Sequence, residues 1–160
     1  MMNDELKPKR KPRAGRSDQF IIHNSSFSIF TWPVRVYYED TDLGGVVYYA
    51  NYLKFLERAR TEWLRARGFE QNALAAVHDV MFIVRSVSLD YRKPARFNDE
   101  LEVTVDLREI GASRIALHQL VRRGQEDLVA AQVEIACVNT ATFRPVRIPE
   151  PVIAKIGKKT

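Results

Sequence analysis

The sequence predicts an α+β domain in which a curved antiparallel sheet of about five strands wraps around one long helix. Three observations lead to this fold. One segment has the apolar spacing of a long amphipathic helix, several later segments alternate apolar and polar residues, and short turns separate those segments. Because short turns join antiparallel neighbours, the strands are expected to form one antiparallel sheet. The helix is then available to cover the apolar face of that sheet.

Length and composition are typical of a single globular domain, with 160 residues, 46% of them hydrophobic and 28% charged. No apolar run approaches the roughly 20 residues of a membrane-spanning helix, and the segment after Met1 does not resemble a signal peptide. Cys137 is the sole cysteine, which excludes an intrachain disulfide and a cysteine-based metal cluster. These features favour a cytoplasmic protein.

The net charge of +5 is concentrated near the N-terminus, where the first 18 residues contain six basic and three acidic side chains. Residues 1–26 are predicted to be a basic disordered arm, because they are poor in apolar residues and contain Pro8, Pro12 and Gly15. Contact with nucleic acid or an anionic membrane is one interpretation, and a solvated extension is the other. The arm lacks basic–aromatic repeats, so we favour the extension and expect no nucleic-acid partner.

The folded domain is predicted to span residues 27–143. A strand over 27–38 and a polar loop precede a helix over 50–67, which ends where Gly68 suits a helix C-cap. The apolar stripe of this helix consists of Tyr52, Phe55, Leu56, Ala59, Trp63 and Leu64.

Four further strands are expected over 86–91, over 101–108, from 115 and over 129–137. Residues 144–160 contain three prolines and three lysines and are predicted to be an extended C-terminal tail. Because one helix covers a five-stranded sheet poorly, we expect a sheet edge or face to be buried by self-association.

The loop before the helix has the most unusual composition, with Glu39, Asp40 and Asp42 followed by Gly44 and Gly45. Peptide N–H groups at a helix start are free to donate, and the helix dipole there favours negative charge. A carboxylate just ahead of the helix can serve as general base or nucleophile. Acyl transfer or hydrolysis uses both parts, although a structural acidic loop has the same pattern. No metal site is predicted, because no paired carboxylates or histidines stand at metal-binding spacing.

Two stretches of the sequence resemble a known family. Residues 36–52, VYYEDTDLGGVVYYANY, followed by Glu57-Arg58-Ala59-Arg60, closely resemble the signature of YbgC-like acyl-CoA thioesterases. These enzymes belong to the hotdog superfamily and are related to 4-hydroxybenzoyl-CoA thioesterase. Residues 88–99, SLDYRKPARFND, resemble the second characteristic stretch of the family. The resemblance covers residues 31–143 and leaves the basic arm outside.

The resemblance implies a hotdog fold and hydrolysis of coenzyme A or acyl-carrier-protein thioesters without a metal or redox cofactor. It also implies homodimers or homotetramers with active sites between subunits. The family's catalytic carboxylate falls on Asp42, and the backbone amide that polarises the thioester carbonyl falls on Tyr49. The family name derives from a gene cluster for the Tol–Pal envelope system, which suggests a link to phospholipid or the envelope, through acyl carrier protein.

Tyr49 departs from the family pattern, since many YbgC-like members have a histidine at this position. A histidine can exchange protons near neutral pH, whereas a tyrosine, with an ordinary pKa of about 10, is a poor base there. The backbone N–H survives the exchange. We therefore expect Asp42 and the Tyr49 amide to carry the reaction without a histidine-assisted route.

Other residues are candidates for contacts with the substrate. Tyr38 and Tyr48 flank the loop and are expected either to line an acyl pocket or to belong to the core. The candidates for the phosphates of coenzyme A, with ordinary solvated surface as the alternative, are Ser113, Arg114, Arg92 and Lys93.

Several reactive residue types are given structural interpretations instead. Some other hotdog thioesterases use a glutamate of the long helix, where Glu57 lies, but we expect Glu57 to form an ion pair with Arg58 or Arg60 on the helix surface. Cys137 is expected to be a small core residue. No catalytic role is expected for the histidines, which are His23, His78 and His118.

A hotdog module that binds a thioester or a partner without turnover is the alternative to an enzyme, and an Asp42→Asn variant separates the two. A hotdog dehydratase is disfavoured, because the sequence lacks the histidine-containing loop with the Pro-Gly pattern of that group.

Overall fold

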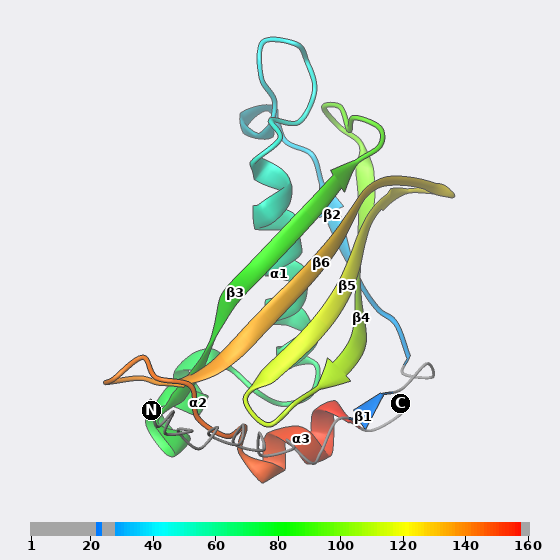
Figure 1. The fold of residues 1–160 in the computed structure, drawn as a ribbon. Coiled ribbons are helices and arrows are strands. Elements are labelled where there is room, and N and C mark those ends of the chain that lie inside the picture. Colours follow the sequence, from blue (N-terminus) through cyan, green and yellow to red (C-terminus); the bar gives the residue numbers. More distant parts are fainter. Residues whose placement is uncertain (1–21, 24–27, 158–160) are drawn as a thin grey trace, which may run out of the picture.

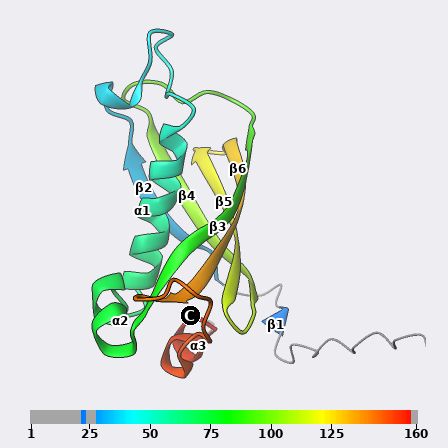
Figure 2. The same cartoon turned by 60° about the vertical axis from the view of Figure 1, so that its left-hand side comes forward.

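The computed structural model describes residues 22–23 and 28–157, and in this part of the chain a curved antiparallel sheet wraps around helix α1 (Figures 1 and 2). The strands are β1 (Ile22–His23), β2 (Phe30–Arg35), β3 (Val80–Tyr91), β4 (Glu100–Ile110), β5 (Arg114–Arg123) and β6 (Glu126–Asn139). The helices are α1 (Asn51–Arg65), α2 (Gln71–His78) and α3 (Glu150–Ile156), and residues Tyr38–Asp40 form a 3₁₀ turn, η1. The predicted α+β architecture is confirmed, and no helix among the described residues is long and apolar enough to cross a membrane.

The sheet has the strand order β2-β4-β5-β6-β3, and every neighbouring pair is antiparallel. The very short β1 pairs with the last residues of β4, on the same side as β2. Most of the predicted basic arm, residues 1–21 and 24–26, lies outside the described residues. At the opposite side of the sheet, β3 pairs with β6 and with no other described strand, so it forms an edge.

Helix α1 packs its apolar stripe into the core. All six residues of the predicted stripe are buried, which confirms that face of the helix. The helix ends within two residues of the predicted limit. It is closed by hydrogen bonds from Gly68 N–H to Arg65 O (2.9 Å) and from Phe69 N–H to Leu64 O (3.1 Å). With a φ of +82°, Gly68 adopts the left-handed conformation that this type of helix cap requires.

The edge strand β3 leaves apolar side chains uncovered. Val87 and Tyr91 are 39% and 47% exposed, although their cross-strand partners on β6, Val133 and Val129, are buried. Partners directly opposite in a sheet point to the same face, so this face is well covered over β6 but only partly over β3, where Tyr52 of α1 packs against Tyr91. The structure thus agrees with the expectation that one helix is too narrow for the whole sheet.

Two segments differ from the predictions. Helix α2, which was not predicted, is short, ends at His78 and has a single buried residue. The prediction of an extended C-terminal tail was wrong for residues 150–156, which form α3 with Val152 and Ile156 buried. Proline is tolerated in the first turn of a helix because its missing N–H has no partner there, so Pro151, the second residue of α3, does not prevent the helix.

The first long strand is also shorter than predicted. The prediction ran over residues 27–38, but β2 ends at Arg35 and Tyr38 begins the turn η1. This turn directs the chain away from the sheet and into the loop that precedes α1 (Figure 1).

Candidate functional site

The acidic loop folds into a small hairpin. Thr41 pairs with Val47, the Asp42 N–H donates to Val46 O (2.9 Å), and the Gly45 N–H donates to Asp42 O (3.0 Å). Gly45 has a φ of +71°, a conformation that glycine adopts without strain. The hairpin projects beyond the end of the sheet, directly before the first turn of α1 (Figures 1 and 2).

Asp40 has a structural role in this loop. Its side chain is buried, and Oδ2 accepts a hydrogen bond from the Tyr37 N–H at 2.8 Å. Its backbone carbonyl accepts two more, from the Tyr48 N–H at 2.9 Å and from Asn51 Nδ2 at 3.0 Å. Asp40 therefore fastens the base of the hairpin to the start of the helix.

Asp42 differs from Asp40 in its exposure. Its carboxylate lies on the exposed hairpin, where Oδ1 accepts a hydrogen bond from the Gly44 N–H at 2.8 Å. This is the only hydrogen bond of the carboxylate with the described residues, and they give it no ion-pair partner. The second carboxylate oxygen remains available for a water molecule or a substrate.

The start of α1 offers a backbone donor at Tyr49. The Asn51 N–H donates to the Tyr48 carbonyl at 2.8 Å, and the Tyr49 carbonyl accepts from the Tyr91 hydroxyl at 2.9 Å. No acceptor among the described residues takes the Tyr49 N–H. Free N–H groups at a helix start attract negative charge, so this position can polarise a docked carbonyl.

An open pocket of about 250 Å³ lies beside this helix start. It brings together three residues that the sequence analysis proposed for the site, Tyr49, Arg92 and Lys93. The remaining lining residues are Val47, Tyr52, Tyr91 and Pro94. Tyr91 was missed, although it lies in the second family-like stretch directly before Arg92, which was the available signal.

The other two candidate tyrosines do not line this pocket. The rings of Tyr48 and Tyr49 are in contact, with centroids 4.9 Å apart, so Tyr48 adjoins the pocket without lining it. Tyr38 is 81% exposed, which rules out the core as its location, and its ring packs edge-on against Phe97.

The two basic residues of the pocket already have acidic partners. Arg92 Nε lies 2.9 Å from an oxygen of Asp90, and Lys93 Nζ lies 2.9 Å from Glu126 Oε1. Both cations are about half exposed, so these ion pairs are weak and open to competition.

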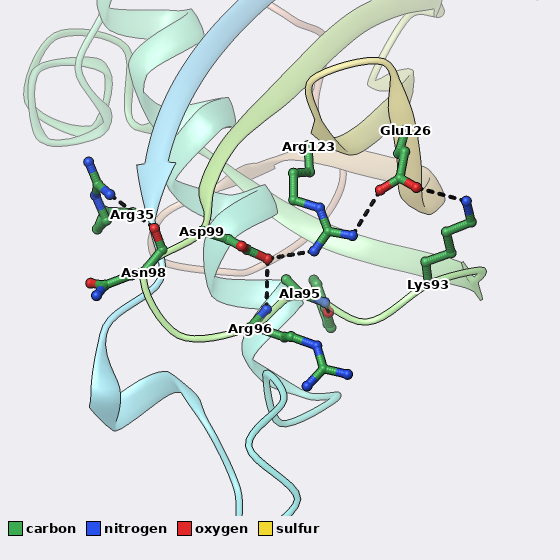
Figure 3. Close-up of polar contacts among 9 residues, drawn as sticks. Arg35, Lys93, Ala95, Arg96, Asn98, Asp99, Arg123 and Glu126 are labelled. Carbon is green, nitrogen blue, oxygen red and sulfur yellow. Dashed lines mark hydrogen bonds and ion pairs between the residues drawn. The ribbon is translucent and has the colours of Figure 1, made fainter.

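Lys93 is the end of a chain of alternating charges (Figure 3). Glu126 also accepts from Arg123 at 2.8 Å, and Arg123 donates to Asp99 at 2.7 Å. Hydrogen bonding to Lys93 and to Arg123 lowers the pKa of the Glu126 carboxyl. The chain fixes the loop over 93–99 next to the pocket, because Asp99 also accepts from the Arg96 N–H at 2.8 Å.

Ser113 and Arg114 are not brought to this pocket within one chain. They lie at the β4–β5 turn, at the end of the sheet opposite to the hairpin (Figures 1 and 2). A ten-residue strand such as β5 spans roughly 33 Å, so the two regions are about a strand length apart. Arg114 lies 3.7 Å from Glu134, and the Ser113 carbonyl accepts from the Cys137 N–H.

The residues given structural interpretations lie away from the pocket. Cys137 is buried, and burial raises the pKa of its thiol to about 11, which excludes a thiolate nucleophile near neutral pH. Glu57 accepts a hydrogen bond from Thr61 at 2.7 Å, and although burial lowers the pKa of the Arg60 guanidinium overall, the charge of Glu57 acts to raise it. The described residues form no direct ion pair with Glu57, so the predicted pair with Arg58 or Arg60 is present only as this longer-range attraction to Arg60. His118 lies in β5, His78 ends α2 and His23 ends β1.

Comparisons with known proteins agree with the fold and with the motif. Residues 36–156, which include α3, match the model of the thioesterase-like superfamily. The acyl-CoA thioester hydrolase YbgC of Escherichia coli O6:H1 is 43% identical over 129 residues, covering 80% of this chain and 96% of that protein. The acyl-CoA thioesterase YbgC of Haemophilus influenzae is 43% identical over 125 residues, covering 78% and 92%.

Solved structures give the same result. A probable thioesterase from Bartonella henselae has a TM-score of 0.73 at 35% identity, covering 76% of this chain and all of that one. A 1,4-dihydroxy-2-naphthoyl-CoA thioesterase from Synechocystis has a TM-score of 0.76 at 25% identity, covering 82% and 97%. The chain belongs to the thioesterase-like superfamily and, within it, to the YbgC-like acyl-CoA thioesterases.

Proposed function

We propose that the protein hydrolyses acyl-CoA thioesters, with Asp42 as general base or nucleophile and the Tyr49 backbone N–H as the donor to the carbonyl oxygen. The observation that carries the proposal is the unpartnered Tyr49 N–H at the start of α1, beside an open pocket and just after the hairpin that exposes Asp42. The relatives named as acyl-CoA thioester hydrolases support the same reaction class.

The proposed reaction begins with the thioester carbonyl docked against the Tyr49 N–H. This donor and the helix dipole stabilise the negative charge that develops on the carbonyl oxygen; in other enzymes, losing one such donor costs about 2.7–4 kcal/mol. Asp42 either removes a proton from the attacking water or attacks the carbonyl carbon itself, forming an anhydride that water then hydrolyses. In both routes the C–S bond breaks, the thiolate of coenzyme A leaves, and a carboxylic acid is released.

Arg92 and Lys93 are proposed to bind the phosphates of coenzyme A at the rim of the pocket. Phosphate would exchange with the carboxylates that these two side chains now contact, and guanidinium and ammonium groups suit that exchange. Ser113 and Arg114 can assist only at a pocket belonging to another copy of the chain, because of their distance along the sheet.

A homo-oligomer formed through β3 is part of the proposal. This twelve-residue strand has one side without a described partner, and the apolar residues along it include Ile83, Val84, Val87 and Tyr91, all at least 36% exposed. Antiparallel pairing of two such edges would extend the sheet and cover the apolar strip. A partner on this edge would also close the open side of the pocket, to which Tyr91 contributes. Light scattering separates dimer from tetramer.

Acyl carrier protein is proposed as a second source of the thioester, with the cytoplasm as the place of reaction. Carrier proteins and coenzyme A present the acyl group on the same phosphopantetheine thiol, so the same carboxylate and amide serve both. Parallel rates with one acyl group on each carrier measure the preference.

The test is a panel of acyl-CoA substrates assayed by colorimetric thiol release, with wild type and Asp42→Asn. We expect wild-type turnover and a loss of at least about 100-fold in the variant, the low end of general-base effects. Glu39→Gln is the matched control, since Glu39 is an exposed carboxylate of the same loop without a partner among the described residues, and it should retain full activity. Near-normal turnover by Asp42→Asn would contradict the mechanism. Thioester binding without hydrolysis by wild type would favour the non-catalytic module.

A further inference from the structure

We infer that Tyr91 is a positioning residue, whose hydroxyl holds the Tyr49 carbonyl and thereby fixes the helix-start peptide groups that face the thioester. This inference rests on the proposed function. It adds a residue of the edge strand β3 to the machinery at the start of α1, 42 positions away in the sequence.

The hydrogen bonds around Tyr49 show why an outside donor is needed. In an α-helix the N–H four residues later would donate to the Tyr49 carbonyl, but the Leu53 N–H donates to Ala50 O at 3.1 Å. The Tyr49 carbonyl therefore takes its donor from Tyr91, at 2.9 Å. Without that hydroxyl, no described group would hold this carbonyl.

The restraint acts on both peptide planes that meet at Tyr49. The plane before it is held at the Tyr48 carbonyl by the Asn51 N–H, at 2.8 Å. The plane after it contains the Tyr49 carbonyl, which Tyr91 holds. The N–H of Tyr49 lies in the plane before it, and the N–H of Ala50 lies in the plane after it. With both planes fixed, the two backbone torsions of Tyr49 are fixed too, and these two N–H groups keep their directions relative to each other.

The hydroxyl also has an electrostatic effect. A carbonyl oxygen beside the pocket carries partial negative charge and would repel both the thioester oxygen and the oxyanion that develops from it. The bond from Tyr91 occupies this oxygen and offsets its charge. The local field then favours the transition state more than it favours the bound substrate, which is the condition for an effect on kcat.

The ring of Tyr91 is itself well supported. It packs edge-on against Tyr49 and Tyr52, with centroids 6.3 and 5.7 Å away. Tyr52 is buried, and its hydroxyl accepts from the Ala95 N–H at 3.0 Å, which ties this cluster to the core. Burial raises the pKa of the Tyr91 hydroxyl, so the proton that it donates stays in place at neutral pH.

The experiment compares Tyr91→Phe with wild type in acyl-CoA hydrolysis. The substitution keeps the ring and removes the hydroxyl, so we expect kcat to fall about tenfold, the upper range for one neutral hydrogen bond, with KM within about twofold. The thermal midpoint should stay within about 2 °C, because the bond is solvent-exposed. Tyr37→Phe is the matched control: its side chain is 61% exposed, its hydroxyl has no partner among the described residues, and its kinetics should not change.

A wild-type kcat in Tyr91→Phe would overturn the positioning role, and so would a loss confined to KM or to stability. Asp42→Asn, measured in parallel, separates this failure from failure of the proposed function. If Asp42→Asn is inactive while Tyr91→Phe keeps full kcat, only the positioning role is wrong. If wild type hydrolyses no acyl-CoA, the proposed function is wrong and the positioning role with it.

Discussion

The two ends of helix α1 differ in burial and in whether their backbone groups have hydrogen-bond partners. At its C-terminal end Trp63 and Leu64 are buried, and the backbone is closed by the hydrogen bonds around Gly68. At its N-terminal end Tyr49 is 62% exposed and its N–H has no described acceptor. Buried polar groups are almost always paired, so an unpaired donor is tolerated only where solvent or a ligand can reach it. The C-terminal end of α1, which we call the closed end, stabilises the fold. The N-terminal end, which we call the open end, leaves a backbone donor free to bind a substrate.

The closed end provides the largest expected change in stability. Ile156 belongs to α3, which lies against this end of α1, since Lys155 Nζ is 5.1 Å from the ring centroid of Phe69. Ile156 is 1% exposed, so Ile156→Ala should lower the free energy of unfolding by about 2–5 kcal/mol through lost burial and a cavity. The kcat of the folded enzyme should not change. Urea unfolding checks this, with Val77→Ala on the exposed side of α2 as control. An unchanged midpoint for Ile156→Ala would mean that α3 contributes nothing to the closed end.

Tyr52 lies in the first turn of α1, at the open end, but its side chain is part of the core. Its hydroxyl is the acceptor for the Ala95 N–H, so Tyr52→Phe leaves a buried donor without a partner and should cost about 1–3 kcal/mol of unfolding free energy. Tyr38→Phe, on an exposed ring, should cost almost nothing. Equal urea midpoints for Tyr52→Phe and Tyr38→Phe would show that the Tyr52 hydroxyl does not stabilise the fold.

The chain of alternating charges beside the pocket predicts that one substitution strengthens acyl-CoA binding instead of weakening it. Glu126→Gln removes the partner of Lys93, so the ammonium is free for a phosphate, and KM for acyl-CoA should fall about two- to fivefold at unchanged kcat. The fall should shrink at high salt, because the contact is exposed. Glu100→Gln, which removes an acid paired with Arg35, is the control. A KM that does not move would exclude Lys93 as a phosphate ligand.

At neutral pH the smallest expected effect is that of the Cys137 thiol, because it develops only as the pH rises above 9. Its pKa is raised from 9.0 to about 11 by burial, so the unfolded chain loses this proton first as the pH rises. Stability is then fully present below pH 9 and falls as the pH approaches 11. The difference in urea midpoint between wild type and Cys137→Ala, followed from pH 8 to pH 10.5, isolates this effect. A difference that stays constant would show that the folded thiol titrates normally.

The sequence predicted best what depends on neighbouring residues. The stripe of α1 repeats every three or four residues, and the inward residues of β4, from Leu101 to Leu107, alternate with a period of two. Helices α2 and α3 were missed because α2 buries only Leu74 and α3 begins among prolines, so neither carries a strong periodic signal.

The candidate site was predictable in part for a similar reason. Asp42 and Tyr49 stand in one continuous motif, whereas Tyr91 acts through a contact with a distant segment that no local pattern records. Ser113 and Arg114 were placed by residue type alone. Their distance from the pocket follows from the sheet topology, which the spacing of residues does not reveal.

The most direct test of the central claim is a crystal structure of the protein with an acyl-CoA analogue in which a methylene replaces the thioester sulfur. The account predicts the carbonyl oxygen about 2.7–3.1 Å from the Tyr49 nitrogen, with an Asp42 carboxylate facing the carbonyl carbon. A carbonyl group bound away from the start of α1, or held there with no Asp42 carboxylate near it, would contradict the account.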